Sequence, residues 1–218
     1  ALQKLQKEAP PMPFADIAAQ IRAELGDDPE QVFDHIEERP HAAASIGQVH
    51  RARTRDGREV IVKVQYPGVD RSVDSDLQQL RLTLKLGGLL KIPKDSVDQL
   101  FNEIRLRLCE ELDYTHEARN LDRFRAFHRG EAGLVIPEVL PALSSRRVLT
   151  LVFEDGDHIS AVAAPTYTQE IVNLIGHRLF KTMADQLFGF QAIHGDPHAG
   201  NFAFRPDGTV IIYDFGCV

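Results

Sequence analysis

The sequence predicts an α+β fold, and three observations lead to this class. The chain has 218 residues, 43% hydrophobic and 26% charged, which is the balance of a globular protein with a substantial core. Its apolar residues follow a helical period in some stretches and alternate, as in strands, in others. Turn signals such as Asp56-Gly57 and Pro206-Asp207-Gly208 separate short strand-like runs and indicate hairpins.

Helices are expected where apolar residues recur every three or four positions. Gly26 ends the first helix, Pro29 suits the first turn of the second, and Pro93 separates the third from the fourth. Residues 1–13, which end in a proline-rich run, are expected to be an extended linker. In chain order, the expected helices cover residues 14–25, 29–37, 72–91, 95–128 and 168–188.

Strands are expected where short β-branched and apolar runs are bounded by turn residues. The first two are joined by the Asp-Gly turn, the next two by a turn over 141–145, and the last two by the Pro-Asp-Gly turn. In chain order, the expected strands cover residues 46–53, 60–65, 135–139, 147–153, 201–204 and 210–213. The order of helices and hairpins predicts a boundary near residue 154.

The charge balance disfavours nucleic acid as a partner. Lys and Arg number 25 against 32 Asp and Glu, which gives a net charge of −7, whereas nucleic acid attracts basic surfaces. Any phosphate must therefore bind in a local pocket. The two cysteines, Cys109 and Cys217, are too few for a disulfide framework and fit a reducing compartment.

The densest group of polar side chains is the segment HGDPHAGN over residues 194–201, followed by DFG at 214–216. Asp196 and Asn201 have the D-x-x-x-x-N spacing of a kinase catalytic loop, and Asp214 opens the D-F-G motif. Carboxylate and amide oxygens are ligands that Mg²⁺ prefers. Asn201 and Asp214, at opposite ends of a short hairpin, are thus candidate metal ligands, and Asp196 is a candidate to orient the attacking hydroxyl or water.

A second interpretation of this segment is a transition-metal site made by His194, Asp196 and His198, because imidazole and carboxylate are common ligands. Ligands at alternate positions suit a strand. Gly195 and Pro197 favour a loop instead, so the kinase-like interpretation is preferred.

Upstream, Lys63 closes the run VIVK, which matches the strand whose lysine holds the α- and β-phosphates in kinases. An exposed lysine at the end of a strand is the alternative. The run AAASIGQV over residues 42–49 occupies the frame of the kinase glycine-rich loop, although only Gly47 and Val49 match it; alone, this run would also suit the start of a helix. The candidate nucleotide-binding residues are Ala42, Ala43, Ala44, Ser45, Gly47, Val49 and Lys63.

The segment ELDYTHEARN over residues 111–120 lies in the expected helix 95–128. On one helix, Glu110, Asp113 and Glu117 would stack on a single face, one turn apart. Such a stack of like charges indicates either a binding site or a solvated acidic face, and spacing alone leaves both open.

With these residues in view, the sequence resembles the UbiB/ADCK (AarF-domain) family of atypical protein-kinase-like proteins. The resemblance covers nearly the whole chain. Its most specific marks are AAASIGQVH, VKVQYPG around Lys63, ELDYTHEARN, and HGDPHAGN with DFG.

The resemblance implies a bilobal protein-kinase-like fold that binds ATP or ADP with Mg²⁺. The implied segments are an N-terminal extension over 1–40, an N-lobe with an antiparallel sheet and extra helices over 41–153, and a hinge with part of the C-lobe over 154–218. By position, the resemblance implies these roles: Lys63 binds phosphate with Glu117 as its helix partner, Glu154 lies at the nucleotide-binding hinge, Glu111 and Asp113 form a regulatory E-x-D motif, Asp196 is catalytic, and Asn201 and Asp214 hold metal.

Family members are linked to isoprenoid quinone and other prenyl-lipid metabolism at membranes, with an activity closer to ATP hydrolysis than to protein phosphorylation. We therefore expect an atypical kinase-like ATPase with membrane lipid or prenyl-lipid pathway proteins as partners, cytoplasmic and peripheral at the inner membrane. The family's K-x-G-Q motif is absent from this sequence. Two other functions stay open: a small-molecule phosphotransferase of the aminoglycoside or choline kinase type, and a non-catalytic nucleotide-sensing scaffold.

Overall fold

The computed structural model describes residues 11–44, 46–69, 75, 77–80, 82–83, 94–163 and 165–218. Residues 1–10 of the expected linker 1–13, most of the expected helix 72–91, and Ser45 therefore lie outside the described residues, as do the side chains of Cys109 and Glu111. Residues 11–13 are not helical, as the prolines predict. The chain forms two compact units, and each is described by itself. Unit 1 comprises Ala1–Tyr114 with Leu143–Leu149, and unit 2 comprises Thr115–Ala142 with Thr150–Val218. The division into lobes at residue 153 stays a prediction.

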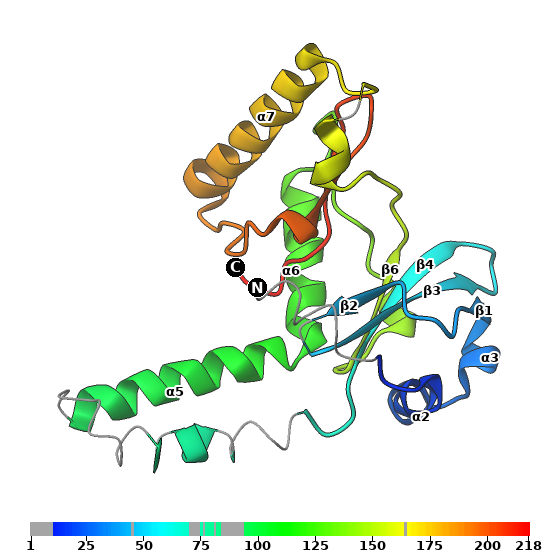
Figure 1. The fold of residues 1–218 in the computed structure, drawn as a ribbon, viewed down its shortest axis with the longest axis vertical. Helices are drawn as coiled ribbons and strands as arrows, with labels where there is room; N and C mark the ends of the chain where they lie inside the picture. The colour runs from blue at the N-terminus through cyan, green and yellow to red at the C-terminus, as the bar shows by residue number, and fades with distance from the viewer. Residues whose placement is uncertain are drawn as a thin grey trace. The chain divides into compact units, whose positions relative to one another are not determined.

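The core of unit 1 is an antiparallel sheet, shown in Figure 1. β3 and β4 form a long hairpin, with β6 beside β4, while β1 and β2 both pair with the other edge of β3. Gly57 adopts a φ of 87° in the β3–β4 turn, which confirms the hairpin expected from Asp56-Gly57. The strands are β1 (Phe33–Ile36), β2 (Ala42–Ala44), β3 (Gly47–Thr54), β4 (Glu59–Gln65) and β6 (Val148–Val152), of which only Val148 and Leu149 belong to unit 1.

The first helix of unit 1, α2 (Phe14–Leu25), has the predicted bounds, and Gly26 ends it with a φ of 92°. The second helix is shorter than predicted. α3 covers only Pro29–Val32, and the remainder of the expected helix 29–37 is strand β1. Residues 33–36 pair with β3 and bury the first and last side chains of the strand, so sheet pairing prevails over the local helical pattern.

The predicted helix 95–128 is wrong as a single element. The structure has two helices, α5 (Lys94–Glu111) and α6 (Tyr114–Phe127), separated at Leu112 and Asp113. The N–H of Asp113 donates to the carbonyl of Glu110 at 3.1 Å, and the N–H of Tyr114 donates to the carbonyl of Arg146 at 2.9 Å. Because Tyr114 bonds to a distant segment instead of to the preceding turn, the helix ends here.

Unit 2 contains a three-stranded sheet in the order β5-β8-β7. β7 (Phe202–Phe204) and β8 (Val210–Ile212) form the predicted C-terminal hairpin. The predicted hairpin between 135–139 and 147–153 forms only next to its turn: the N–H of Leu140 donates to the Thr150 carbonyl at 2.9 Å, the N–H of Val152 donates to the Glu138 carbonyl at 2.8 Å, and Val139 lies opposite Leu151 between them. At its outer end, β5 (Leu134–Val135) instead pairs in parallel with β8. Pro137 has no N–H to donate and ends the ladder of β5.

Helix α7 (Gln169–Ala184) begins where the sequence predicts, with the side chain of Thr168 accepting from the N–H of Ile171. It continues directly into the π-helix η3 (Asp185–Phe190). Short 3-10 helices complete the described elements: η1 (Pro141–Leu143), η2 (Ile159–Ala163) and η4 (Ala199–Asn201). Among the described residues, no helix has both the length and the apolar character needed to cross a membrane.

Candidate active site

The segment from His194 to Asn201 forms a loop in unit 2, exposed over residues 195–200, with His194 buried and Asn201 half-buried. It ends in η4, where the side chain of His198 accepts from the N–H of Gly200. The Asn201 amide nitrogen donates to the Asp196 carboxylate at 2.8 Å and to the Asp196 carbonyl at 3.1 Å. Since its nitrogen is used in this way, the Asn201 amide presents its oxygen as the atom available to a cation.

The β7–β8 hairpin brings Asn201 and Asp214 to the same end of unit 2. Phe202 pairs with Ile212, and the N–H of Tyr213 donates to the carbonyl of Asn201 at 2.9 Å. Asn201 directly precedes β7, and Asp214 follows shortly after the end of β8, so both residues lie at the same end of the hairpin. The backbones of the two residues, which the sequence separates by a hairpin, therefore lie close together, as they must if both side chains are to supply hard oxygen ligands to one Mg²⁺.

The D-F-G backbone is held by two side chains that were not expected to contact it: His194, a candidate metal ligand in the alternative interpretation, and Asn120. His194 Nε2 donates to the Asp214 carbonyl at 2.6 Å, and Asn120 Nδ2, from α6, donates to the Phe215 carbonyl at 3.0 Å. The fully buried ring of Phe215 packs on Phe124 and on His194, with ring centroids 4.7 and 5.1 Å apart. Asn120 is the last residue of the ELDYTHEARN motif. Apart from its place in this motif, nothing in the sequence indicated that it would contact Phe215.

In unit 1, the predicted nucleotide-binding residues lie on the β2–β3–β4 sheet. Ala42 pairs with Val49, and Val49 pairs with Lys63, so these three side chains form one row on one face of the sheet. Ala44 and Gly47 belong to the neighbouring row on that face, whereas Ala43 pairs with Gln48 on the opposite face. The helix start that AAASIGQV alone would also suit is excluded, because residues 42–44 form a strand.

Gly47 meets a packing requirement that the glycine-rich-loop frame did not reveal. A Cβ at this position would lie 2.1 Å from the Val64 carbonyl oxygen, so only glycine lets β3 approach β4 this closely. Its φ is not in the left-handed region. Ser45, the remaining candidate of this loop, lies outside the described residues.

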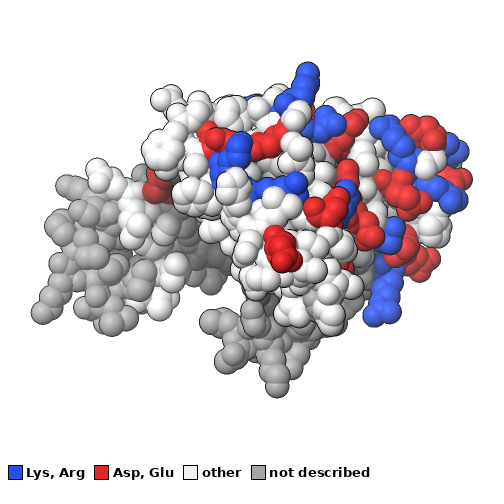
Figure 2. All heavy atoms as spheres, turned by 90° about the horizontal axis from the view of Figure 1, so that it is seen from above, with Lys and Arg blue, Asp and Glu red and all other residues white. Residues whose placement is uncertain are grey.

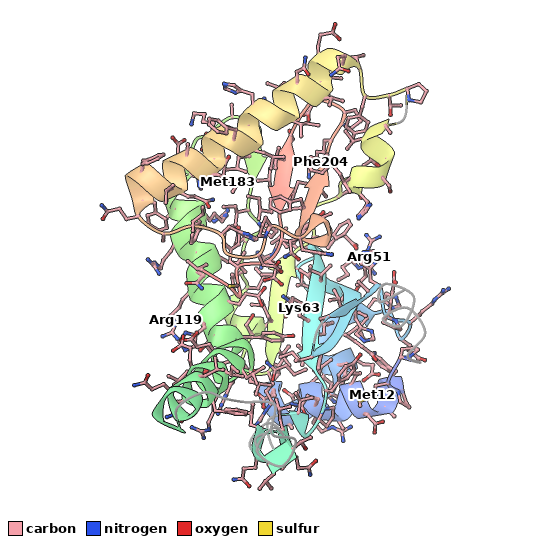
Figure 3. All side chains as sticks on the ribbon, turned by 60° about the vertical axis from the view of Figure 1, so that its left-hand side comes forward. Met12, Arg51, Lys63, Arg119, Met183 and Phe204 are labelled. Atoms are coloured by element: carbon pink, nitrogen blue, oxygen red, sulfur yellow. The ribbon has the colours of Figure 1, made fainter. Side chains whose placement is uncertain are left out.

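Lys63, labelled on β4 in Figure 3, is a buried residue with 8% of its surface exposed. This burial excludes the exposed strand-end alternative. Its Nζ lies 5.4 Å from the centre of the Tyr114 ring, a cation–π contact within unit 1. Its predicted partner Glu117 lies in the first turn of α6 in unit 2 and is 4% exposed. Both candidates are charged groups kept out of water, which is typical of functional ionisable residues, and their pairing stays a prediction.

The predicted carboxylate stack is wrong, because Asp113 lies in the break between α5 and α6 and not on a continuous helix face. Asp113 Oδ2 lies 3.9 Å from Arg146 Nε, a loose ion pair. The side chain of Glu111, the other half of the E-x-D motif, lies outside the described residues.

Glu154, the predicted hinge residue, is held at both its side chain and its backbone. Its carboxylate accepts from Arg205 at 2.7 Å, and its carbonyl accepts from the hydroxyl of Tyr213 at 2.8 Å. Burial raises the pKa of Tyr213 to about 12, so this hydroxyl remains a donor at neutral pH. The contacts fix Glu154 relative to the β7–β8 hairpin that carries Asn201 and Asp214.

The alternative of a histidine metal site gains no support from the geometry. His194 uses Nε2 on a backbone carbonyl, and His198 caps η4. Within the described part of the chain, no three side chains of His, Cys, Asp or Glu are grouped so that they could hold a metal ion. Acidic and basic side chains are interspersed on the face shown in Figure 2, so electrostatic attraction of phosphate depends on local residues such as Lys63.

Comparison with known proteins adds independent evidence. The family model described as "ABC1 atypical kinase-like domain" matches residues 4–218. The chain is 33% identical over 220 residues to the mitochondrial atypical kinase coq-8 of Caenorhabditis elegans, covering 98% of this chain and 29% of that protein. It is 33% identical over 217 residues to the mitochondrial atypical kinase COQ8 of Saccharomyces cerevisiae, covering 99% and 42%.

A third relative is AarF domain-containing protein kinase 1 of Xenopus laevis, 34% identical over 221 residues, with 99% of this chain and 42% of that protein covered. Among solved structures, the complex of Rv3197 with erythromycin from Mycobacterium tuberculosis matches with a TM-score of 0.81 and 33% identity, covering 99% of this chain and 54% of that one. The chain thus spans less than half the length of these three curated relatives.

Proposed function

The chain belongs to the ABC1 atypical kinase-like family, and from this premise we propose that it binds ATP with Mg²⁺ and hydrolyses it in support of isoprenoid quinone or other prenyl-lipid biosynthesis. The fold is α+β and kinase-like, a partial ABC1 domain. The kinase-like family itself implies a nucleotide site.

One observation carries the proposal: Asp196, Asn201 and Asp214 gather at one end of the β7–β8 hairpin. One Asp196 oxygen accepts from Asn201, which fixes the carboxylate, and the exposed loop leaves the group open to a substrate. In the proposed mechanism, Asp196 orients a water or hydroxyl for in-line attack.

The donor set also fits the metal. Asp214 offers a carboxylate, and Asn201 offers the amide oxygen left by its contact with Asp196, both hard oxygen ligands. When bound, Mg²⁺ supplies positive charge that offsets the charge developing on the phosphates. We propose that Lys63 holds the α- and β-phosphates, with Glu117 fixing its orientation. The row Ala42–Val49–Lys63 would then be the sheet face that covers the nucleotide.

The membrane and pathway assignments rest on the family resemblance. Two relatives named above are mitochondrial, and another, from Arabidopsis thaliana, is chloroplastic. We propose that this protein is cytoplasmic, peripheral at the inner membrane, and acts with membrane lipid or prenyl-lipid pathway proteins.

The test measures thermal stabilisation and ATP hydrolysis by the purified protein. We expect MgATP at a hundredfold excess over its Kd to stabilise the wild type by about 2.7 kcal/mol. The Asp214→Asn variant should lose this metal-dependent stabilisation, because an amide is a poor substitute for the carboxylate ligand. Asp196→Asn should still bind nucleotide but lose hydrolysis. Asp122→Asn, an exposed carboxylate on α6, is the matched control.

The outcomes separate the proposed function from its competitors. Full MgATP stabilisation in Asp214→Asn would contradict the metal site. Nucleotide binding without hydrolysis in the wild type, with prenyl-lipid vesicles present, would favour the scaffold function. Turnover that appears only with amino-hydroxy compounds would favour a small-molecule phosphotransferase. Erythromycin belongs in that screen, because the solved relative Rv3197 was obtained in complex with it.

A further inference from the structure

Behind the candidate catalytic loop, unit 2 contains a continuous chain of hydrogen bonds between side chains from three separate segments. It begins at Glu131, passes through His128 and Gln186, and ends at the backbone N–H of His194. The next contact, from His194 Nε2 to the Asp214 carbonyl at 2.6 Å, extends the chain to the D-F-G motif. His128 and Gln186 carry no role in the mechanism above.

In this series of hydrogen bonds, the chemistry of each partner determines which atom donates and which accepts. Glu131 accepts from His128 Nδ1 at 2.7 Å. Burial raises the pKa of Glu131, but hydrogen bonds from Lys181 and His128 outweigh it, so the pKa falls below its ordinary value and the group stays an acceptor. His128 therefore carries its proton on Nδ1, which leaves Nε2 as an acceptor.

Gln186 joins this imidazole to the catalytic loop. Its Nε2 lies 3.2 Å from His128 Nε2, and its Oε1 accepts from the N–H of His194 at 3.1 Å. Both contacts agree on one amide orientation, nitrogen toward His128 and oxygen toward the loop. Gln186 is 1% exposed and His194 is 6% exposed, so water offers little compensation if either contact is lost.

The backbone of Gln186 holds the same segment. Its carbonyl accepts from the N–H groups of Gln191 and Ala192. Gln191, at the end of η3, adopts a φ of 56°. The π-helix thus turns the chain back so that residues 191–194 return along Gln186. Such π-helical turns often occur at functional sites.

We propose that His128 and Gln186 are positioning residues that fix the backbone of the catalytic loop at His194 and, through the His194 imidazole, the Asp214 carbonyl. The proposal rests on the proposed function of Asp196 and Asp214. His194 is two residues from Asp196, so a displacement of its backbone moves the carboxylate. A misplacement of about 1 Å can lower a rate about a hundredfold.

The amide of Gln186 has one orientation that satisfies both of its contacts. Turning it over would place its nitrogen against the N–H of His194, a donor against a donor. The charged groups around the His128 ring are Glu131, from the turn after α6, and Lys181 of α7, which pairs with both Glu131 and Asp185 at the start of η3.

The experiment compares Gln186→Met with Gln186→Glu in the purified protein. Met keeps the volume but neither hydrogen bond, and we expect kcat for ATP hydrolysis to fall about a hundredfold with KM for ATP changed less than about threefold. Thr182→Val is the matched control: Thr182 lies one turn earlier in the same helical run and is equally buried, and we expect its kcat to stay near the wild-type value. All rates are measured below the melting temperature of each variant.

Gln186→Glu separates positioning from general packing. Its carboxylate still accepts from the N–H of His194, whereas methionine offers no acceptor at that place. We therefore expect Gln186→Glu to recover about tenfold of the kcat that Gln186→Met loses. Equal impairment of the two variants, or full kcat in folded Gln186→Met, would overturn the proposal.

A second readout does not depend on activity. We expect the His194 amide to exchange with solvent at least about tenfold faster in Gln186→Met than in the wild type or in Thr182→Val. If the wild type hydrolyses no ATP but shows this pattern, the proposed function fails and the positioning role stands. If the wild type hydrolyses ATP but the His194 amide exchanges at the same rate in Gln186→Met as in the wild type, the positioning role fails.

Discussion

Gly47, at the start of β3, offers the sharpest test of the sheet that carries Lys63. Alanine at this position would place its Cβ 2.1 Å from the Val64 carbonyl oxygen and 2.9 Å from the Val64 carbonyl carbon. Both obstacles are backbone atoms, so no side-chain rotation relieves the overlap. The strands β3 and β4 must separate at the pairs Gly47–Gln65 and Gln48–Val64.

The expected cost of Gly47→Ala follows from this geometry. Overpacking of a well-packed site costs about 1–3 kcal/mol, and each ladder hydrogen bond lost adds about 1 kcal/mol. We therefore expect the free energy of unfolding to fall by about 2–4 kcal/mol, with a shift of the melting temperature of about 2–4 °C per kcal/mol for a chain of this size. Urea unfolding followed by circular dichroism measures it.

The control is Gly176→Ala in α7, where a Cβ meets nothing within 4 Å. Because alanine is the better helix former, this change should raise the stability by about 0.5–1 kcal/mol. A Gly47→Ala protein as stable as the wild type would refute the close approach of β3 and β4. Gly47 would then be explained by a close approach of the nucleotide to the backbone, as its place in the glycine-rich-loop frame indicates.

Two further predictions concern unit 2. Burial, with a hydrogen bond to Asp157, raises the pKa of Tyr167 from 10.0 to about 12. Because the pKa is higher in the folded than in the unfolded state, the stability that Tyr167 contributes is complete below pH 10.0 and is lost as the pH rises toward about 12. Tyr167→Phe should lose this part of the alkaline decrease in stability, and an unchanged pH profile would contradict the assignment. Asn120→Ala removes the donor to the Phe215 carbonyl and should lower the free energy of unfolding in urea by about 1 kcal/mol. Asn173→Ala, which removes an exposed hydrogen bond with Gln169 on α7, should change it little. Equal effects of the two changes would show that the half-buried contact of Asn120 adds no stability.

Much of the candidate site was predictable because its parts are close in sequence. The spacing of Asp196, Asn201 and Asp214 is set by one loop and one hairpin, and the Pro-Asp-Gly turn that closes the hairpin has a strong local preference. The α+β class and the bounds of α2 followed in the same way, from local periodicity and a terminal glycine.

Other features depended on distant partners and escaped the sequence. Leu112 and Asp113 interrupt a stretch with good helical spacing, because the N–H of Tyr114 bonds to Arg146, more than thirty residues later. Residues 33–36 form a strand because β3 offers an open edge. In each case, a long-range hydrogen bond competes with a local preference worth only a few tenths of a kcal/mol, about the size of most helix-propensity differences.

The sequence by itself determined the chemistry: which carboxylates, amide and lysine are present, and their order along short turns whose geometry is local. Tertiary structure alone decided which side chains contact the D-F-G motif and the catalytic loop: Asn120 bonds to the Phe215 carbonyl, and Gln186 joins His128 to the N–H of His194. The physical reason is that a buried polar group must find a partner wherever the fold brings one, and local periodicity contains no information on where that will be.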